Sequence, residues 1–169
     1  MQAEGRIVYP LGEFGFTTSI QAGIIFDANF NVAAYTTPTL GGSSGGGYFS
    51  GVSVGYFPNA KSVSEVKGWG ANAGAIYAIG KSFAAEGNVA LGDSDFRLGG
   101  TLATPISAGY GGAGYAEFSY TFMTKPVNVL NMSIVNFANF LNSNLPNSNY
   151  SPNDALRIIQ YMNNKINQY

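Results

Sequence analysis

Apolar and polar positions alternate with a period of two in several runs within the first 122 residues. The clearest run covers residues 14–26, where Phe14, Phe16 and Ile20 share one phase and Thr17 and Gln21 share the other. A period of two predicts a β-strand, and 13 residues is long for a globular sheet. We therefore expect strands with bulky side chains on one face and small or polar side chains on the other.

Six further segments predict strands: 32–37, 48–57, 71–80, 83–92, 96–104 and 107–122. Short polar segments predict the turns between them, among them Gly80-Lys81-Ser82 and Asp93-Ser94-Asp95. The glycine-rich stretch 41–47 predicts a flexible loop or a distorted edge. Residues 62–67 predict one helical turn, because Ser62 and Glu65 have the spacing of a capping box.

Beyond Pro126 the period becomes helical, and the glycines, all 23 of which precede Tyr115, stop. One apolar stripe joins Val127, Leu130, Ile134, Phe137 and Leu141. A second helix is expected after Ser151-Pro152-Asn153-Asp154, which carries a serine cap and proline at the first turn. The sequence predicts a mainly β protein: an antiparallel meander of about seven to eight strands forming a small β-barrel or sandwich over 1–126. Two C-terminal α-helices, within 127–169, would pack on it.

Composition narrows the possible functions. Charged residues make up 10% of the chain, against about 25% in typical soluble domains, and the net charge is −1. This charge does not favour nucleic acid as a partner. The chain has no cysteine and no histidine, which excludes disulfides, thiolate metal sites and Ser-His-Asp or Cys-His catalysis. We expect no metal and no cofactor. No apolar run is long enough for a membrane-spanning helix, and the start shows no signal-peptide pattern.

The few charges within the strands fall on the small or polar phase. Glu86, Arg97 and Glu117 lie on that phase, together with Gln21 and Asn88. In a closed barrel they would converge on one lumen, where two carboxylates and an arginine shift one another's pKa values and could act as acid and base. The alternative is an outward polar face, or a structural ion pair between Glu86 and Arg97.

Two further features allow a binding role and a structural one. Trp69, the single tryptophan, lies between two glycines and is either a packing anchor or a ligand platform. Residues 109–114 have the letters of a dinucleotide-binding glycine motif, but they lie within a strand pattern and open no helix. A bulge or a close strand crossing explains these glycines better.

Several segments carry a family resemblance: Phe26–Val32, Gly55–Val63, Gly68–Gly74 and Gly114–Phe122. Over roughly residues 14–122 the chain resembles the glycine-rich β domains at the C-termini of Rhs-repeat and related bacterial polymorphic-toxin proteins. The Asn-rich helical tail lies outside that pattern. The resemblance implies a secreted antibacterial effector for interbacterial competition, delivered by a larger carrier polypeptide and neutralised by a cognate immunity protein.

Three functions therefore stay open at the level of sequence. The first is a toxin module whose β region acts on a target membrane, which suits long alternating strands with few charges. The second is a histidine-independent enzyme toxin that uses Glu86, Arg97 and Glu117. The third is a non-enzymatic module, either a ligand-binding barrel or an outer-membrane-type barrel. The chain ends in helices rather than in a strand, which speaks against the last of these.

Overall fold

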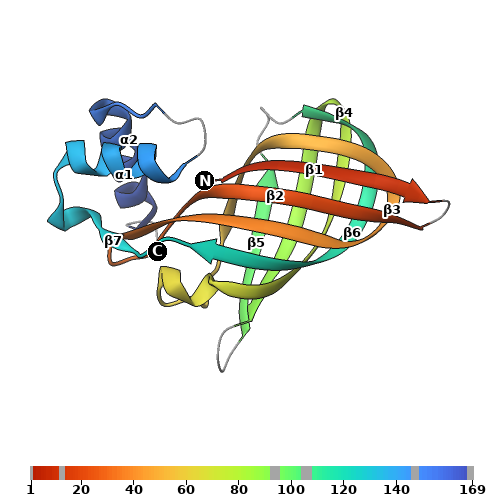
Figure 1. Ribbon diagram of the computed structural model, residues 1–169, viewed down its shortest axis with the longest axis horizontal. Coiled ribbons are helices and arrows are strands. Elements are labelled where there is room, and N and C mark those ends of the chain that lie inside the picture. Colours follow the sequence, from red (N-terminus) through yellow and green to blue (C-terminus); the bar gives the residue numbers. More distant parts are fainter. Residues whose placement is uncertain (1, 12–13, 92–95, 104–107, 146–148, 167–169) are drawn as a thin grey trace.

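The computed structural model describes residues 2–11, 14–91, 96–103, 108–145 and 149–166 (Figure 1). The predicted turn at 93–95 lies outside these ranges. The strands are β1 (Gln2–Leu11), β2 (Phe14–Phe26), β3 (Asn31–Tyr56), β4 (Gly68–Leu91), β5 (Phe96–Ala103), β6 (Ala108–Met123) and β7 (Val127–Asn128). The helices are the 3-10 turns η1 (Val63–Val66) and η2 (Val129–Asn131), and the α-helices α1 (Ile134–Asn144) and α2 (Pro152–Ile166).

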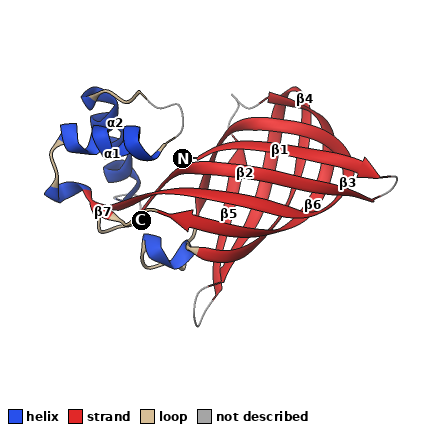
Figure 2. Cartoon of the chain, viewed as in Figure 1, coloured by secondary structure: helices blue, strands red, loops and turns tan. Residues whose placement is uncertain are grey.

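The strands form one antiparallel sheet that closes into a ring. Its order is β1-β2-β3-β5-β4-β6, and the additional pairings β3–β6 and β1–β3 close it. Figure 2 shows the resulting barrel with the two α-helices gathered beyond one of its ends. The predicted fold class is confirmed: a mainly β, antiparallel barrel with two C-terminal helices. The order differs from a simple meander in that β6 lies between β3 and β4.

Strand β3 reverses its direction between Ser43 and Gly47. Its first part pairs with β2 from Val32 to Ser43, and its later part pairs with β1 from Gly47 to Ser53. Because β1 and β2 run antiparallel to each other, β3 can be antiparallel to both only by turning back. Figure 1 shows β3 and β6 curving together around the end of the barrel that faces away from the helices.

Glycine makes this reversal possible. Gly45 has φ 90°, and a Cβ added there would lie 2.2 Å from the carbonyl oxygen of Gly112 in β6. Gly111 has φ 106° and the same close approach to Gly46. Side chains at these positions would collide with the neighbouring backbone. Of the two alternatives predicted for 41–47, a flexible loop or a distorted edge, the loop is wrong, since these residues pair with β6 throughout. The glycines at 109–114 form the matching part of β6.

Strand β4 also folds back on itself. The sequence predicts two strands here, whereas β4 runs without interruption from Gly68 to Leu91. A Cβ added at Gly70 would lie 2.7 Å from the carbonyl oxygen of Val89, and one at Gly74 would lie 2.5 Å from that of Ala85. The two arms of β4 are thus adjacent, as a hairpin around the predicted turn at 80–82 requires.

The C-terminal helices have a conventional apolar core. Phe137, Leu141 and Met162 are fully buried, and they share one cluster with Ile24 of β2 and Val32 of β3. This cluster attaches the helices to one end of the barrel. The helical stripe predicted from residue 127 is wrong at its start, because Val127 and Asn128 pair with β3 and α1 begins at Ile134.

Candidate functional site in the barrel interior

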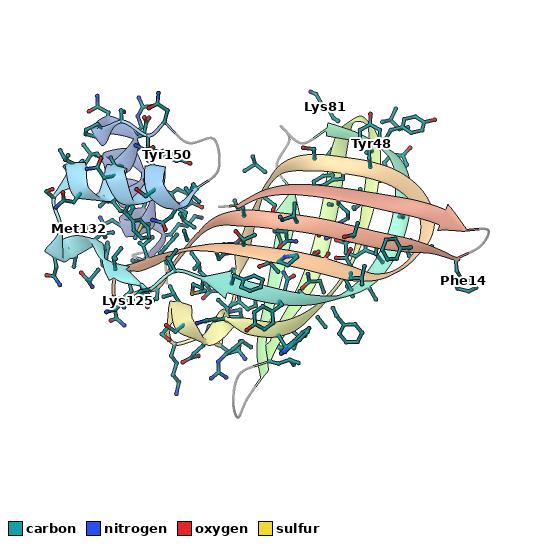
Figure 3. All side chains as sticks on the ribbon, viewed as in Figure 1. Phe14, Tyr48, Lys81, Lys125, Met132 and Tyr150 are labelled. Carbon is teal, nitrogen blue, oxygen red and sulfur yellow. The ribbon has the colours of Figure 1, made fainter. Side chains whose placement is uncertain are left out.

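The two faces of the strands have opposite polarity, and the polar face is inside. In β2, Thr17, Ser19 and Gln21 are buried, whereas Phe14 is 77% exposed. The same division holds along most of β3 to β6, and Figure 3 shows Phe14 and Tyr48 directed away from the barrel. The large apolar side chains exposed on β2 to β6 are Phe14, Phe16, Ile20, Leu40, Tyr48, Val54, Tyr56, Trp69, Tyr77, Ile79, Phe83, Leu91, Leu98, Leu102, Tyr110, Phe118 and Phe122.

Charged side chains are absent from the body of this outer surface. Within the described parts of β2 to β6 the charged residues are Lys81, Glu86, Arg97 and Glu117. Glu86 and Glu117 are buried, Arg97 lies at the rim on the inward phase, and Lys81 stands at the tip of the β4 hairpin. Figure 3 places Lys81 and Lys125 at opposite ends of the strand region. The described outer surface of β2 to β6 therefore carries no formal charge between the two ends.

Inside the barrel, an apolar cluster lies nearest the reversal of β3. Phe49, Ile76 and Tyr115 are buried together, and Ala84 packs against them. They come from β3, β4 and β6, close to the glycines at which the strands bend. This cluster fills the interior at that end.

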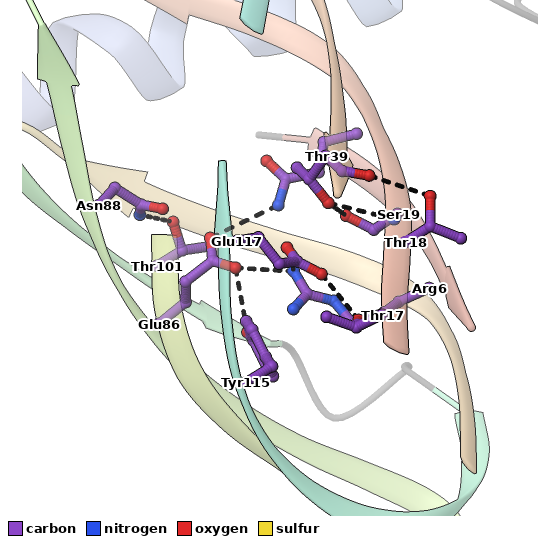
Figure 4. A network of polar contacts seen from close by, with 11 residues as sticks. Arg6, Thr17, Thr18, Ser19, Thr39, Glu86, Asn88, Thr101, Tyr115 and Glu117 are labelled. Atoms are coloured by element: carbon purple, nitrogen blue, oxygen red, sulfur yellow. Dashed lines mark hydrogen bonds and ion pairs between the residues drawn. The ribbon is translucent and has the colours of Figure 1, made fainter. Parts of the chain in front are cut away.

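The next layer is a buried network of charged and polar groups (Figure 4). Arg6 Nη2 lies 2.7 Å from Glu86 Oε2 and 3.3 Å from Glu117 Oε2. The Arg6 guanidinium carbon is 3.6 Å from the centre of the Tyr115 ring, whose hydroxyl donates to Glu86 Oε2. Thr17 Oγ1 donates to Glu117 Oε1 at 2.7 Å. Arg6 is 1% exposed and Glu117 3%, so the network is screened from solvent.

Toward the helices the interior widens into a cavity of about 610 Å³. Its inner wall carries amides and hydroxyls, including Gln21, Asn72, Asn88 and Ser119. Gln21 Nε2 lies 3.4 Å from Glu86 Oε1, so this side chain stands between the cavity and the charged network. Neither Glu86 nor Glu117 lines the cavity.

The structure brings together most of the residues that the sequence predicts as a site. Gln21, Glu86, Asn88 and Glu117 all lie inside the barrel. Gln21, Asn88 and Trp69, the predicted binding residues, all border the cavity. Trp69 does so from the rim: it is 62% exposed and in edge-to-face contact with Tyr120, so the alternative of a buried packing anchor is wrong.

Arg97 is the residue that the sequence misplaces. Its Nε lies 2.5 Å from Glu65 Oε2, and both side chains are partly exposed. Hydrogen bonds from the Lys61 backbone N–H and then from Arg97 lower the pKa of Glu65 below its ordinary value. The predicted alternative of an ion pair between Glu86 and Arg97 is therefore wrong. The helical turn at 63–66 is present, but Ser62 makes no side-chain capping bond.

Arg6 is the interior residue that the sequence leaves out. The segment Gln2-Ala3-Glu4-Gly5-Arg6 shows no alternation of large apolar residues, so β1 itself is not predicted. The sequence does give one indication of Arg6: the two carboxylates predicted inside the barrel need a positively charged partner there. The candidates before the helices are few, and Arg6 is one of the three arginines in the chain.

Neither a metal site nor a membrane-crossing helix is found. Within the described ranges no three acidic side chains gather closely enough to ligate a metal ion. None of the described helices combines the length and apolarity needed to cross a membrane. No known protein family matches the chain, and searches of curated proteins and of solved structures find no significant match. The class is therefore defined by the chain's own geometry, an antiparallel barrel with a polar interior and an apolar exterior.

Proposed function

We propose that the β region is embedded in a lipid membrane and that it anchors the α1–α2 unit at one membrane face. The carrying observation is the outer surface of β2 to β6, which exposes large apolar side chains and no charge between its two ends. Water-soluble monomers rarely expose contiguous apolar surface beyond a few hundred square ångströms. Lipid acyl chains satisfy such a surface, and a closed ring of strands leaves no unpaired backbone edge in the membrane.

The dimensions of the apolar surface support this proposal. Along β4 the outward row is Trp69, Ala71, Ala73, Ala75, Tyr77 and Ile79, without a charged side chain. At about 3.3 Å per residue, Trp69 and Ile79 are separated by ~33 Å along the strand. A strand tilt of roughly 40° reduces this to ~25 Å across the membrane, which equals the usual height of the apolar band in membrane barrels.

Aromatic residues lie at both ends of this surface. At the end near the helices Trp69, Tyr120 and Phe122 contact one another, with ring centres 5.1 Å and 4.8 Å apart for successive pairs. At the other end Tyr48 pairs in register with Tyr110 across β3 and β6. Tyrosine and tryptophan favour the membrane–water interface because each has an apolar ring and a polar group.

The interior supports an anchor rather than a channel. The cluster of Phe49, Ile76 and Tyr115 and the Arg6 network occupy the lumen beyond the cavity. A barrel of this size is normally filled by its own side chains. The catalytic role predicted for Glu86, Arg97 and Glu117 stays a prediction, and the placement of Arg97 away from the two buried carboxylates gives it no support.

The antibacterial role also stays a prediction, as do secretion, the carrier polypeptide and the immunity protein. Insertion into a target membrane would be the step by which such an effector acts. The anchor proposal concerns that step alone, and it holds equally for a barrel that resides in the membrane of its own cell.

Trp69 provides a native probe for the test. It is the single tryptophan, and it lies at the edge of the apolar surface. After reconstitution into phosphatidylcholine vesicles, we expect its emission to shift to the blue and to be quenched by lipids brominated near the headgroup. Aqueous iodide should quench it weakly. Strong iodide quenching with no effect of brominated lipid would contradict the proposal.

A matched control uses the helical unit. Val135 in α1 is 55% exposed, so the double variant Trp69→Phe, Val135→Trp carries an exposed tryptophan outside the barrel. We expect iodide to quench this tryptophan and brominated lipid to leave it unchanged. Entrapped dye should not leak from vesicles that contain the wild-type protein, because the lumen is filled.

A further inference from the structure

We propose that the cavity near the helices binds an uncharged, hydroxyl-rich molecule, such as a monosaccharide or disaccharide. The proposal goes beyond the membrane anchor and does not depend on it. It assigns a ligand to the mouth of the barrel, about 610 Å³ in volume, which is within the usual range for small-molecule sites.

Two polar side chains in the wall have no protein partner. Asn72 and Ser119 both line the cavity and are 7% and 5% exposed. Their side chains make no hydrogen bond within the described part of the chain. Neither residue is among those with fully enclosed unpaired side-chain atoms, so the polar groups of Asn72 and Ser119 face the space of the cavity, where they can bind a ligand. A ligand with donors and acceptors would satisfy both groups.

Neighbouring side chains offer further acceptors. Asn88 Nδ2 donates to Thr101 Oγ1 at 2.7 Å, which leaves its carbonyl oxygen for a ligand. Gln21 is oriented in the same way, since its Nε2 faces Glu86. The wall therefore presents two carbonyl oxygens as acceptors, together with an amide and a hydroxyl that can donate. A molecule bearing several hydroxyl groups matches this set, because each hydroxyl both donates and accepts.

The charges around the cavity favour a neutral ligand. The charged lining residues are Asp27, Lys61 and Lys165, none of which lies within a strand. Asp27 already accepts hydrogen bonds from the backbone N–H groups of Asn29 and Asn31. The inner wall thus has no formal charge, and an ion placed there would lose its hydration without a counter-charge. Aromatic lining residues such as Tyr35, Phe57 and Tyr161 give an apolar surface for a sugar ring.

The test is calorimetric titration of the folded full-length protein with glucose, N-acetylglucosamine and maltose. An amine-oxide detergent should be used, because an alkyl glycoside would compete for the site. Glucose 6-phosphate and glucuronate serve as charged counterparts of the same size. We expect at least one neutral sugar to bind and both charged sugars to bind more weakly.

The variants Asn72→Leu and Ser119→Ala locate the site. Neither substitution leaves a protein group unpaired, so we expect both variants to fold, and circular dichroism checks this. Loss of one hydrogen bond should weaken binding by about five- to tenfold. Ser53→Ala is the matched control, because Ser53 is an interior serine without a hydrogen-bond partner that does not line the cavity. Its affinity should equal that of the wild type.

Three outcomes would overturn the proposal: no binding of any neutral sugar, equal or tighter binding of the charged sugars, or binding that Asn72→Leu and Ser119→Ala leave unchanged. None of these outcomes bears on the membrane anchor, which the tryptophan experiment tests separately. Conversely, a barrel that stays soluble and monomeric without detergent would refute the membrane anchor, and the titration could still be made in plain buffer.

Discussion

The barrel and the helical unit bury opposite kinds of side chain. The fully buried residues of the barrel include Arg6, Thr17 and Ser53, whereas those of the helices include Phe137, Leu141 and Met162. The exposed side chains show the opposite polarity: the strands expose phenylalanine, tyrosine and leucine, and the helices expose many asparagines. One chain thus contains two regions that follow opposite rules.

The difference is the one that the proposed membrane anchor requires, since it gives the two regions different surroundings. The helices follow the usual rule for water, in which burial of apolar surface is the main stabilising term. The barrel gains little from that term, because its largest apolar side chains stay exposed. In the proposed membrane anchor, backbone hydrogen bonds and interior polar contacts would stabilise the barrel, and lipid would cover its exterior. Substitutions in the interior network and on the outer surface should therefore affect the barrel and the helices differently.

The largest effect is expected from Arg6→Ala. Among the described residues, Arg6 is the cation of a network that holds two buried carboxylates, and this change removes it. Removing one partner of a buried ion pair costs about 3–5 kcal/mol, because the remaining charge is uncompensated. Unfolding in urea, followed by circular dichroism in detergent, would measure the loss.

A charge-free variant separates charge from packing. In the triple variant Arg6→Met, Glu86→Gln, Glu117→Gln no charge is left uncompensated, and we expect most of the lost stability to return. If the triple variant is as unstable as Arg6→Ala, the pairing of charges does not explain the stability of the interior.

The second prediction concerns the helical core. Leu141 of α1 is fully buried in the core that α1 shares with α2. Leu141→Ala should lower the free energy of unfolding of this unit by about 2–5 kcal/mol, because it leaves a cavity. Among the described residues, the cluster around Ile24 and Val32 and a ring contact between Phe26 and Tyr161 join the helices to the strands. Because this junction is small, we expect the helical signal to melt at lower denaturant while the β signal holds. Loss of both signals in one transition would mean that the two regions are a single cooperative unit.

The sequence predicts the strands well wherever alternation is regular. The period of two in 14–26 and in 107–122 corresponds to β2 and β6, and Ser151 with Asp154 marks the start of α2. The strand order is not predictable in the same way. The reversal of β3 depends on glycines at 45 and 47, and a glycine-rich segment suggests a loop as readily as a strand that bends under close backbone contact.

The candidate site, too, can be predicted from the sequence only in part. Phase along a strand correctly places Gln21, Glu86, Asn88 and Glu117 inside a closed barrel. The alternation gives the face of the sheet on which a residue lies, but not its position along the barrel axis. Arg97 therefore has the predicted orientation but lies at the rim, where it pairs with Glu65 instead of Glu86. The cation that does meet Glu86 lies 80 residues away in sequence, on a strand without regular alternation. Only the closure of the ring brings the two together.

The third prediction compares exposed side chains in the two regions. Ala75 is exposed near the middle of the outward row of β4, where it pairs in register with Gly114 of β6. Ala75→Arg should destabilise the protein in vesicles by about 2–4 kcal/mol, the cost of an arginine that faces lipid near the middle of the membrane. Val135→Arg, on an exposed face of α1, should change stability by no more than about 0.5 kcal/mol. Equal, small effects in reversible vesicle unfolding would show that water covers both surfaces.

The smallest effect concerns the start of α2 and its dependence on pH. Ser151 donates to Asp154 through its hydroxyl, at 2.6 Å, and through its backbone N–H, and these bonds lower the pKa of Asp154 below its ordinary value of 3.8. Because the folded-state pKa is depressed, this contribution is complete above the ordinary value and is lost as the pH falls through the folded pKa. The helical signal should therefore weaken in acid while the β signal stays constant. Ser151→Ala should move this weakening toward the ordinary pKa, and Asp154→Asn should abolish it.

An acid transition that survives in Asp154→Asn would have to arise elsewhere, and parallel loss of the β signal would place it in the barrel rather than in the helices.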